Sequence, residues 1–213
     1  MEIKPILFNA EMVLAILDGR KSCTRRLVKF LSGENPRWTG YIKDGLMLYN
    51  GKNEPCIRKA PYQPGDILYV RETWERFECW NCEGDERGNC PKEPQKSVFD
   101  KTCGCYMYRA TDEIYGDARW HPSIHMPKEA ARIWLKVTNV RVEQLQEITI
   151  DGIRNEGLSS MAVHAGDMEI AMEEWKNLWN STVKKSDINR YGWDANPWVW
   201  VIEFERCEKP EGV

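Results

Sequence analysis

The sequence predicts an α+β fold, a small and mostly antiparallel β-barrel decorated by short helices. Segments with the two-residue alternation of strands outnumber segments with helical spacing. The predicted helices are short and separated by single strands, without the regular βαβ order of a parallel sheet. With 213 residues, 42% of them hydrophobic, the chain can bury a substantial core. We therefore predict one domain over residues 1–213, with an irregular insertion at about 31–60 and a cysteine-rich one at about 76–104.

The first predicted helix covers residues 10–19. Asn9 is a suitable N-cap, and Gly19 ends the helix. The apolar residues of this segment recur at helical spacing: Met12, Val13, Ile16 and Leu17. The segment is therefore expected to pack one apolar face against the core.

A cationic stretch, LDGRKSCTRR, follows at residues 17–26. Its four basic residues, Arg20, Lys21, Arg25 and Arg26, surround Thr24. The last turn of a helix carries partial negative charge, which attracts cations and accounts for Arg20 and Lys21. That attraction does not reach Thr24 or the two arginines after it. This stretch is therefore the first candidate for a binding or catalytic function, on a loop that leaves the helix.

The middle of the chain is predicted to form strands. A possible hairpin surrounds Asp44 and Gly45 within the turn-rich residues 31–60. The segment PGDILYVRETW, residues 64–74, is typical of a turn that leads into a strand. YMYRAT, residues 106–111, is another short strand, and residues 131–145 form a β-branched run that is expected to bend near Asn139.

The last third predicts two helices and a closing strand. Thr149 or Asp151 is expected to cap a short helix that ends at Gly157. Residues 167–183 form the clearest helix, with a stripe made of Ile170, Met172, Trp175, Leu178 and Trp179. Residues 198–207 alternate as the strand that closes the sheet. Of the 10 tryptophans, we expect four to lie in the core: Trp175, Trp179, Trp198 and Trp200.

Five of the 8 cysteines lie close together in the cysteine-rich insertion. They are Cys79, Cys82, Cys90, Cys103 and Cys105, a C-x2-C pair followed by a single cysteine and a C-x-C pair. Four thiolates hold a structural zinc ion, and the polar residues between them lack the apolar surface to order themselves. We predict that four of the five bind zinc; the alternative is an unordered insertion with reduced thiols. A closed four-thiolate site has no open position for chemistry.

The remaining cysteines, Cys23, Cys56 and Cys207, are isolated in the sequence and are expected to be small buried apolar groups. His121 and His125 stand four residues apart, as in some metal sites. Pro122 and Pro127 prevent a regular helix between them, so we do not predict a histidine metal or acid–base pair.

The charge balance excludes a general polyanion-binding surface. The chain has 30 basic and 33 acidic residues and a net charge of −3, so any site for a polyanion is local. It contains no apolar run of about 18 residues, as a membrane span requires. Glu2, Lys4 and Pro5 interrupt the position of a signal peptide. We expect a cytoplasmic protein without a membrane partner.

Several of these segments resemble the ASCH family, barrel domains similar to the RNA-binding PUA fold. The first is G-x-K-x-x-T-x-R, formed by Gly19, Lys21, Thr24 and Arg26. The second is the turn and strand at residues 64–74, and the third is Glu156 followed by Gly157 at the end of a helix. Residues 118–137 and 193–205 further resemble ASCH proteins of phages and prophages. The resemblance covers about residues 5–206 without the two insertions.

The resemblance implies a cleft on one barrel face that holds RNA or a nucleoside. Some small bacterial members are amidohydrolases that remove the acetyl group from N4-acetylcytidine, with a lysine, a threonine and a glutamate in the catalytic roles. The matching residues here are Lys21, Thr24 and Glu156. Other relatives are described as ribonucleases. The expected partner is therefore single-stranded RNA or a modified nucleoside.

The chemistry of these residues fits hydrolysis. A threonine hydroxyl is a poor nucleophile until a base takes its proton, and a lysine serves only if its pKa falls from about 10.4 toward 7. Neighbouring arginines and burial both disfavour a charged lysine. Glu156 could then protonate the leaving amine or orient water. The alternative is that Lys21 and Glu156 form a salt bridge that only ties the helix to the loop.

Binding requires fewer coincidences. Arg25 and Arg26 offer planar forks for phosphate or a base edge, and Trp74 and Trp120 are candidates for stacking on a base. Glu72 could accept a hydrogen bond from a base amino group, although an ion pair with Arg71 or Arg109 explains it equally well.

Three hypotheses remain open. The chain is a nucleic-acid or modified-nucleoside binding domain with a cleft around Lys21, Thr24 and Glu156; or that cleft is an amidohydrolase site for N4-acylated cytidine; or the chain is a zinc-stapled protein-interaction module of phage origin.

Overall fold

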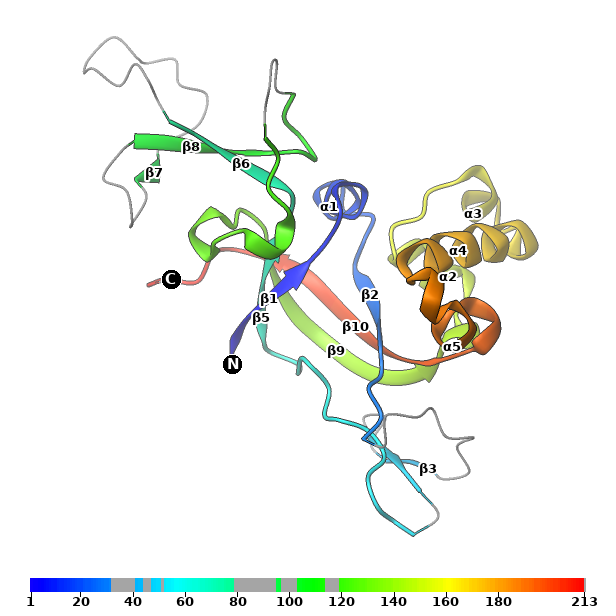
Figure 1. The fold of residues 1–213 in the computed structure, drawn as a ribbon. Helices are drawn as coiled ribbons and strands as arrows, with labels where there is room; N and C mark the ends of the chain where they lie inside the picture. The colour runs from blue at the N-terminus through cyan, green and yellow to red at the C-terminus, as the bar shows by residue number, and fades with distance from the viewer. Residues whose placement is uncertain are drawn as a thin grey trace. The chain divides into compact units, whose positions relative to one another are not determined.

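The computed structural model describes residues 1–31, 41–43, 47–50, 52–78, 95–96, 103–113 and 119–212 (Figure 1). The chain forms two compact units. The first contains Met1–Lys4, Ala15–Leu68 and Trp134–Val213, and the second contains Pro5–Leu14 and Tyr69–Ile133. The candidate residues of the cationic stretch and Glu156 belong to the first unit. The single domain with two insertions stays a prediction.

The described elements alternate between strands and short helices. The strands are β1 (Ile3–Leu7), β2 (Cys23–Leu27), β3 (Tyr41–Lys43), β4 (Met47–Tyr49), β5 (Ile67–Arg71), β6 (Trp74–Glu78), β7 (Gln95–Lys96), β8 (Cys103–Tyr108), β9 (Trp134–Gln144) and β10 (Trp198–Cys207). The α-helices are α1 (Ala10–Leu17), α2 (Ile150–Asn155), α3 (Met161–Ala165), α4 (Met168–Thr182) and α5 (Ile188–Tyr191). Short 3-10 helices are η1 (Ser123–His125), η2 (Lys128–Ala130), η3 (Leu145–Glu147), η4 (Lys185–Asp187) and η5 (Trp193–Ala195).

The main sheet has five strands in the order β1-β5-β9-β10-β2. Strand β10 pairs antiparallel with both β9 and β2. The N–H of Ile67 donates to the carbonyl of Glu2, and the N–H of Phe8 donates to the carbonyl of Arg71, so β1 and β5 run parallel. The predicted α+β class with a mostly antiparallel sheet is confirmed.

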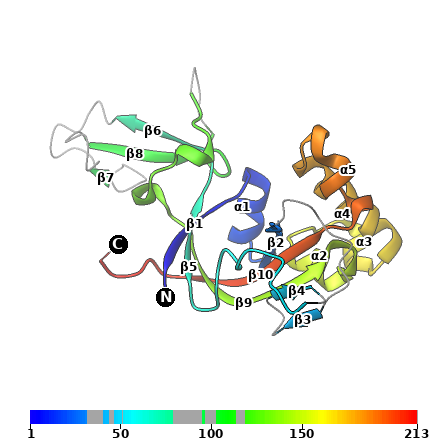
Figure 2. The same cartoon turned by 60° about the horizontal axis from the view of Figure 1, so that its bottom comes forward.

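The two longest strands, β9 and β10, run side by side in both views (Figures 1 and 2). Their register shifts between Glu203 and Phe204, which pair with Asn139 and Val137, so Thr138 is the extra residue of a bulge. The bend predicted near Asn139 is confirmed. The expected hairpin is also present, as the antiparallel pair of β3 and β4.

The cationic stretch differs from its prediction. Residues 23–27 were expected on a loop, but they form β2 and pair with β10, with Arg25 opposite Val201. A run of charges hides the alternation by which a strand is recognised in a sequence. As a strand, the stretch directs neighbouring side chains to opposite faces of the sheet.

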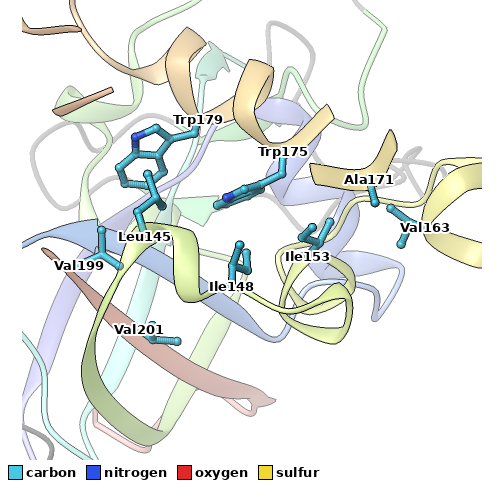
Figure 3. Close-up of a cluster of buried hydrophobic side chains, with 9 residues drawn as sticks. All are labelled: Leu145, Ile148, Ile153, Val163, Ala171, Trp175, Trp179, Val199 and Val201. Atoms are coloured by element: carbon cyan, nitrogen blue, oxygen red, sulfur yellow. The ribbon is translucent and has the colours of Figure 1, made fainter. Parts of the chain in front are cut away.

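Helices α2 to α4 cover an apolar cluster at the ends of β9 and β10 (Figure 3). Its members are Leu145, Ile148, Ile153, Val163, Ala171, Trp175, Trp179, Val199 and Val201. Thr149 caps α2, as predicted, by accepting a hydrogen bond from the N–H of Gly152 at 3.1 Å. The four tryptophans expected in the core are all buried.

The predicted stripe of α4 is wrong at one position. Ile170 is 52% exposed, and the small residue Ala171 takes the buried position beside Trp175 and Trp179. In the part of the chain that the structure describes, no helix has the length and apolar character to cross a membrane.

Two alanine variants of α4 test the assignment of its buried face. Trp175→Ala removes a buried aromatic ring and leaves a cavity, so we expect the free energy of unfolding to fall by about 3–5 kcal/mol. Ile170→Ala removes an exposed side chain and should change it by no more than about 0.5 kcal/mol. Urea denaturation measures both. Equal losses in the two variants would contradict the position of the helix.

Candidate functional site

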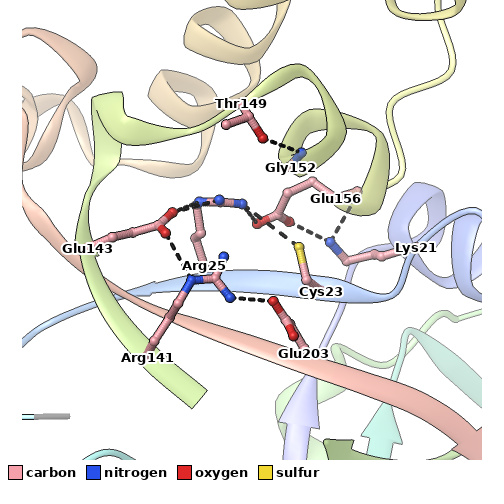
Figure 4. Close-up of polar contacts among 9 residues, drawn as sticks. All are labelled: Lys21, Cys23, Arg25, Arg141, Glu143, Thr149, Gly152, Glu156 and Glu203. Atoms are coloured by element: carbon pink, nitrogen blue, oxygen red, sulfur yellow. Dashed lines mark hydrogen bonds and ion pairs between the residues drawn. The ribbon is translucent and has the colours of Figure 1, made fainter. Parts of the chain in front are cut away.

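The candidate site of the first unit is built around a buried lysine–glutamate pair (Figure 4). Lys21 Nζ donates to Glu156 Oε2 at 2.7 Å and to the backbone carbonyl of Glu156 at 2.8 Å. Their side chains are only 1% and 4% exposed. The two residues also form an isolated β-bridge, and the N–H of Ser22 donates to the carbonyl of Asn155 at 2.8 Å. Backbone and side chains together thus hold the start of β2 against the end of α2.

Gly157 allows this close approach. Its φ of +99° lies in the left-handed region, which L side chains rarely adopt. A Cβ atom added to it would lie 2.8 Å from Ala15 Cβ and 3.1 Å from Lys21 Cβ. The glycine after Glu156, noted in the sequence as part of a motif, is therefore needed to pack the chain that carries Lys21.

Arg25 is a second cation on the same carboxylate. Its Nη1 donates to Glu156 Oε1 at 3.1 Å, while its Nε and Nη2 donate to Glu143 Oε1 at 3.0 and 2.7 Å. Burial alone would lower the pKa of Arg25, but the carboxylates of Glu156 and Glu143 outweigh burial and raise it. Its buried guanidinium is thus held by two carboxylates of its own chain.

The ion pairs continue across the sheet. Arg141 Nε donates to Glu143 Oε2 at 3.2 Å, and Arg141 Nη1 pairs with Glu203. Asn139 Nδ2 donates to Glu203 Oε2 at 3.3 Å. Arg141, Glu143 and Glu203 were not among the site residues predicted from the sequence. The signal was the spacing of Asn139, Arg141 and Glu143 at every second position of a predicted strand, which places their side chains on one face.

The members of this ion network balance in charge. Three cations, Lys21, Arg25 and Arg141, face three carboxylates, Glu143, Glu156 and Glu203. Burying ions costs several kcal/mol each, and apolar residues of similar volume are often at least as stable. The inner part of the network, between Lys21, Arg25 and Glu156, is buried. Because apolar residues would pack there without that cost, such a buried group of charges is a candidate for function.

Cys23 lies beside this network. Burial raises the pKa of its thiol to about 12, and the Glu156 carboxylate adds to the rise although Arg25 and Lys21 oppose it. The thiol is therefore protonated and unreactive at neutral pH. Its predicted burial is confirmed, whereas Cys56 and Cys207 are only half-buried, so that prediction was wrong for them.

Thr24 and Arg26 lie on the other face of β2 from Arg25. They pair with Ile202 and Trp200 of β10, and alternate residues of a strand point to opposite sides. Thr24 is buried, and Arg26 is half-buried. Burial lowers the pKa of Arg26, although Glu156 and Tyr62 oppose this. The structure thus brings Lys21, Arg25 and Glu156 into contact, and directs the side chains of Thr24 and Arg26 to the other face of β2 from Arg25.

The remaining candidates belong to the second unit. Glu72 is 1% exposed and accepts two hydrogen bonds from Arg132, from Nε and Nη2, both at 2.9 Å. Glu72 thus pairs with Arg132, a partner that the sequence did not suggest. The side chains of Trp74 and Trp120 are half-buried.

The predicted zinc ligands are not among the described side chains. Cys79, Cys82 and Cys90 lie outside the described residues, and of Cys103 and Cys105 only the backbone, in β8, is described. The described residues contain no group of three histidine, cysteine, aspartate or glutamate side chains that could hold a metal ion. The structural zinc site stays a prediction.

Comparison of the chain with protein-family models and with curated proteins finds no match. Two solved structures are similar to it. The ASCH domain from Lactobacillus crispatus JV V101 is 12% identical, with a TM-score of 0.39 over 96% of this chain and 79% of that one. The hypothetical protein PH0355 is 15% identical, with a TM-score of 0.36 over 97% of this chain and 100% of that one.

Replacing Gly157 tests the packing that holds Lys21 and Glu156 together. We expect Gly157→Ala to destabilise the protein by roughly 2–4 kcal/mol, because the left-handed backbone strains an alanine and its Cβ displaces Ala15 or Lys21. Gly166 is the matched control: its φ is +76° and a Cβ atom there meets nothing within 4 Å. Gly166→Ala should therefore cost only the strain, about 1 kcal/mol. Equal losses of stability in the two variants, measured by thermal denaturation, would refute this role of Gly157.

Proposed function

We propose that the chain binds a nucleobase, as a nucleoside or within single-stranded RNA, at the Lys21–Glu156 pair. The observation that carries this proposal is the burial of an ammonium and a carboxylate in direct contact at 2.7 Å, where apolar side chains would pack without a desolvation cost. The pair offers a donor and an acceptor side by side. These are the groups that recognise the polar edge of a base.

The charge balance of the ion network favours the base over the phosphate as the group that is bound there. Three cations and three carboxylates leave no excess positive charge, and a phosphate site needs such an excess. Arg25 is held by Glu156 and Glu143, so in this proposal it positions Glu156 and does not contact the ligand. A phosphate of an RNA ligand is assigned to Arg26, on the other face of β2.

A second candidate is hydrolysis of an acylated base such as N4-acetylcytidine. The separation of 2.7 Å between Lys21 Nζ and Glu156 Oε2 favours it, because a proton can pass directly between groups at this distance. Water would attack the acyl carbon, the carbon–nitrogen bond would break, and the pair would transfer a proton from the water to the leaving amine. Thr24 lies on the opposite face of β2 from Arg25, so this candidate uses water as the nucleophile.

A double variant tests the binding site. Lys21→Met/Glu156→Leu replaces the buried pair by apolar side chains of similar length, a change that often preserves a fold. We expect calorimetric titration with cytidine, and with a short single-stranded RNA, to show one equivalent fewer bound per chain than in the wild type. Lys176→Met is the control, because Lys176 is also paired with a carboxylate, that of Asp194 at 3.7 Å. A folded double variant with unchanged binding would exclude the site.

The hydrolysis candidate has its own readout. Wild-type protein incubated with N4-acetylcytidine should release acetate and cytidine, and the double variant should release neither above the uncatalysed rate. General acid–base catalysis contributes typically about 10²–10⁴-fold, so the loss is measurable by chromatography. Thr24→Val should keep most of the activity if water is the nucleophile. Intact substrate after prolonged incubation with the wild type leaves binding alone.

A further inference from the structure

Arg71, the last residue of β5, is a half-buried cation of the second unit whose charge the described residues leave unneutralised. Its one side-chain hydrogen bond in that part of the chain goes from Nη2 to the backbone carbonyl of Ile124. Its Nε is buried without a hydrogen-bond partner there, and no described carboxylate pairs with the guanidinium. Buried polar groups are almost always paired in native proteins, and an unpaired charge costs the most. The guanidinium therefore has donors and charge to offer to a ligand.

A second cation, Lys128, lies along the same face of β5. Tyr69 and Arg71 are alternate residues of this strand, so their side chains share a face, and both are half-buried whereas the residues on either side of Tyr69 are buried. The ammonium of Lys128 is 5.9 Å from the ring centre of Tyr69. Lys128 and Ile124 belong to the short segment of η1 and η2. That segment therefore borders both Tyr69 and Arg71.

The two carboxylates that follow these cations in the chain are engaged elsewhere. Both oxygens of Glu72 accept hydrogen bonds from Arg132, at 2.9 Å. Glu129 accepts a hydrogen bond from the hydroxyl of Tyr106 at 2.7 Å. Lys128 is exposed and, like Arg71, forms no ion pair within the part of the chain that the structure describes. Two cations on one face without a counter-ion repel each other, and an anion bound there would relieve the repulsion.

We propose that Arg71 and Lys128 bind a terminal phosphate group. Such a group carries about two negative charges at pH 7 and three acceptor oxygens, which match two cations that lack carboxylates. A guanidinium offers phosphate a planar fork of N–H donors, and an ammonium adds a point charge. The phosphate belongs either to a small phosphorylated molecule or to the 5′ end of an RNA strand. This site is separate from the Lys21–Glu156 pair and does not depend on the function proposed for that pair.

Calorimetric titration of the full chain with ribose 5-phosphate and with ribose tests the site. Neither probe carries a base, so a nucleobase site does not respond to them. The wild type should bind ribose 5-phosphate roughly tenfold or more tightly than ribose, because hydrogen bonds to a charged group distinguish the two. Inorganic phosphate should compete with ribose 5-phosphate, and added sodium chloride should weaken the binding by screening.

Three variants assign the binding to its residues. Arg71→Met removes the guanidinium but keeps an apolar chain of similar length, and should lower the affinity for ribose 5-phosphate to that for ribose. Lys128→Met should lower it by roughly two- to fivefold, as expected for an exposed ion pair. Arg109→Met is the matched control, because Arg109 is an exposed arginine of the same unit and its removal changes the net charge equally. It should leave binding unchanged, and circular dichroism shows that each variant is folded.

Competition with RNA distinguishes the two sources of the phosphate. A short single-stranded RNA with a 5′-phosphate should displace ribose 5-phosphate, and the same strand with a 5′-hydroxyl should not, if the site takes the end of a strand. If neither strand displaces the probe, the ligand is a small phosphorylated molecule.

Three results would overturn the inference. The first is equal affinity of the wild type for ribose 5-phosphate and ribose, and the second is a folded Arg71→Met variant that keeps the preference. The third is loss of the preference in Arg26→Met, which would place the phosphate in the first unit. Lys21→Met/Glu156→Leu should bind ribose 5-phosphate as the wild type does, whether or not it still binds cytidine. The two proposals therefore fail separately.

Discussion

The pairing of Lys21 with Glu156 is the interaction on which the first unit depends. Charges removed from water must be compensated by partners at short range, or the folded state loses several kcal/mol. Here the compensation comes from three parts of the chain: the start of β2, the end of α2 and the face of β9 that carries Glu143. These contacts hold each of the three parts in one position. Gly157 allows their close approach because it has no Cβ atom.

Strand alternation separates the two polar faces of β2. Cys23 and Arg25 face the ion network, and Thr24 and Arg26 face the other side. The same alternation along β9 and β10 gathers Arg141, Glu143 and Glu203 on the face of Arg25. A short strand of polar residues thus supplies a charge-balanced network on one side and separate polar groups on the other.

The second unit also contains a buried charge, but a single ion pair compensates it. The buried carboxylate of Glu72 is neutralised by Arg132, whose guanidinium also lies 4.0 Å from the ring centre of Tyr108. Both carboxylate oxygens of Glu72 accept a hydrogen bond from Arg132, so a structural role accounts for this ion pair.

The sequence by itself determined the elements whose signals are local. The spacing of apolar residues predicted α1 and α4, the alternation of β-branched residues predicted β9 and β10, and Thr149 predicted the start of α2. The G-x-K-x-x-T-x-R motif and the pair of Glu156 and Gly157 also led to Lys21 and Glu156 as candidate residues. The sequence did not reveal that β2 is a strand, because charged residues carry no apolar alternation. Ile170 was assigned to the stripe of α4 because its side chain is large and apolar, whereas the small Ala171, four residues before Trp175, takes the buried position.

Only the tertiary structure decided which charges meet. Lys21 and Glu156 are 135 residues apart in the chain, and Arg25 and Glu143 are 118 apart. No periodicity spans such distances; the packing of α2 on β2 and the register of β9, β10 and β2 select the partners. The physical reason is that secondary structure follows from neighbours within a few residues, whereas a buried ion is stable only beside the particular counter-ion that the completed fold brings to it.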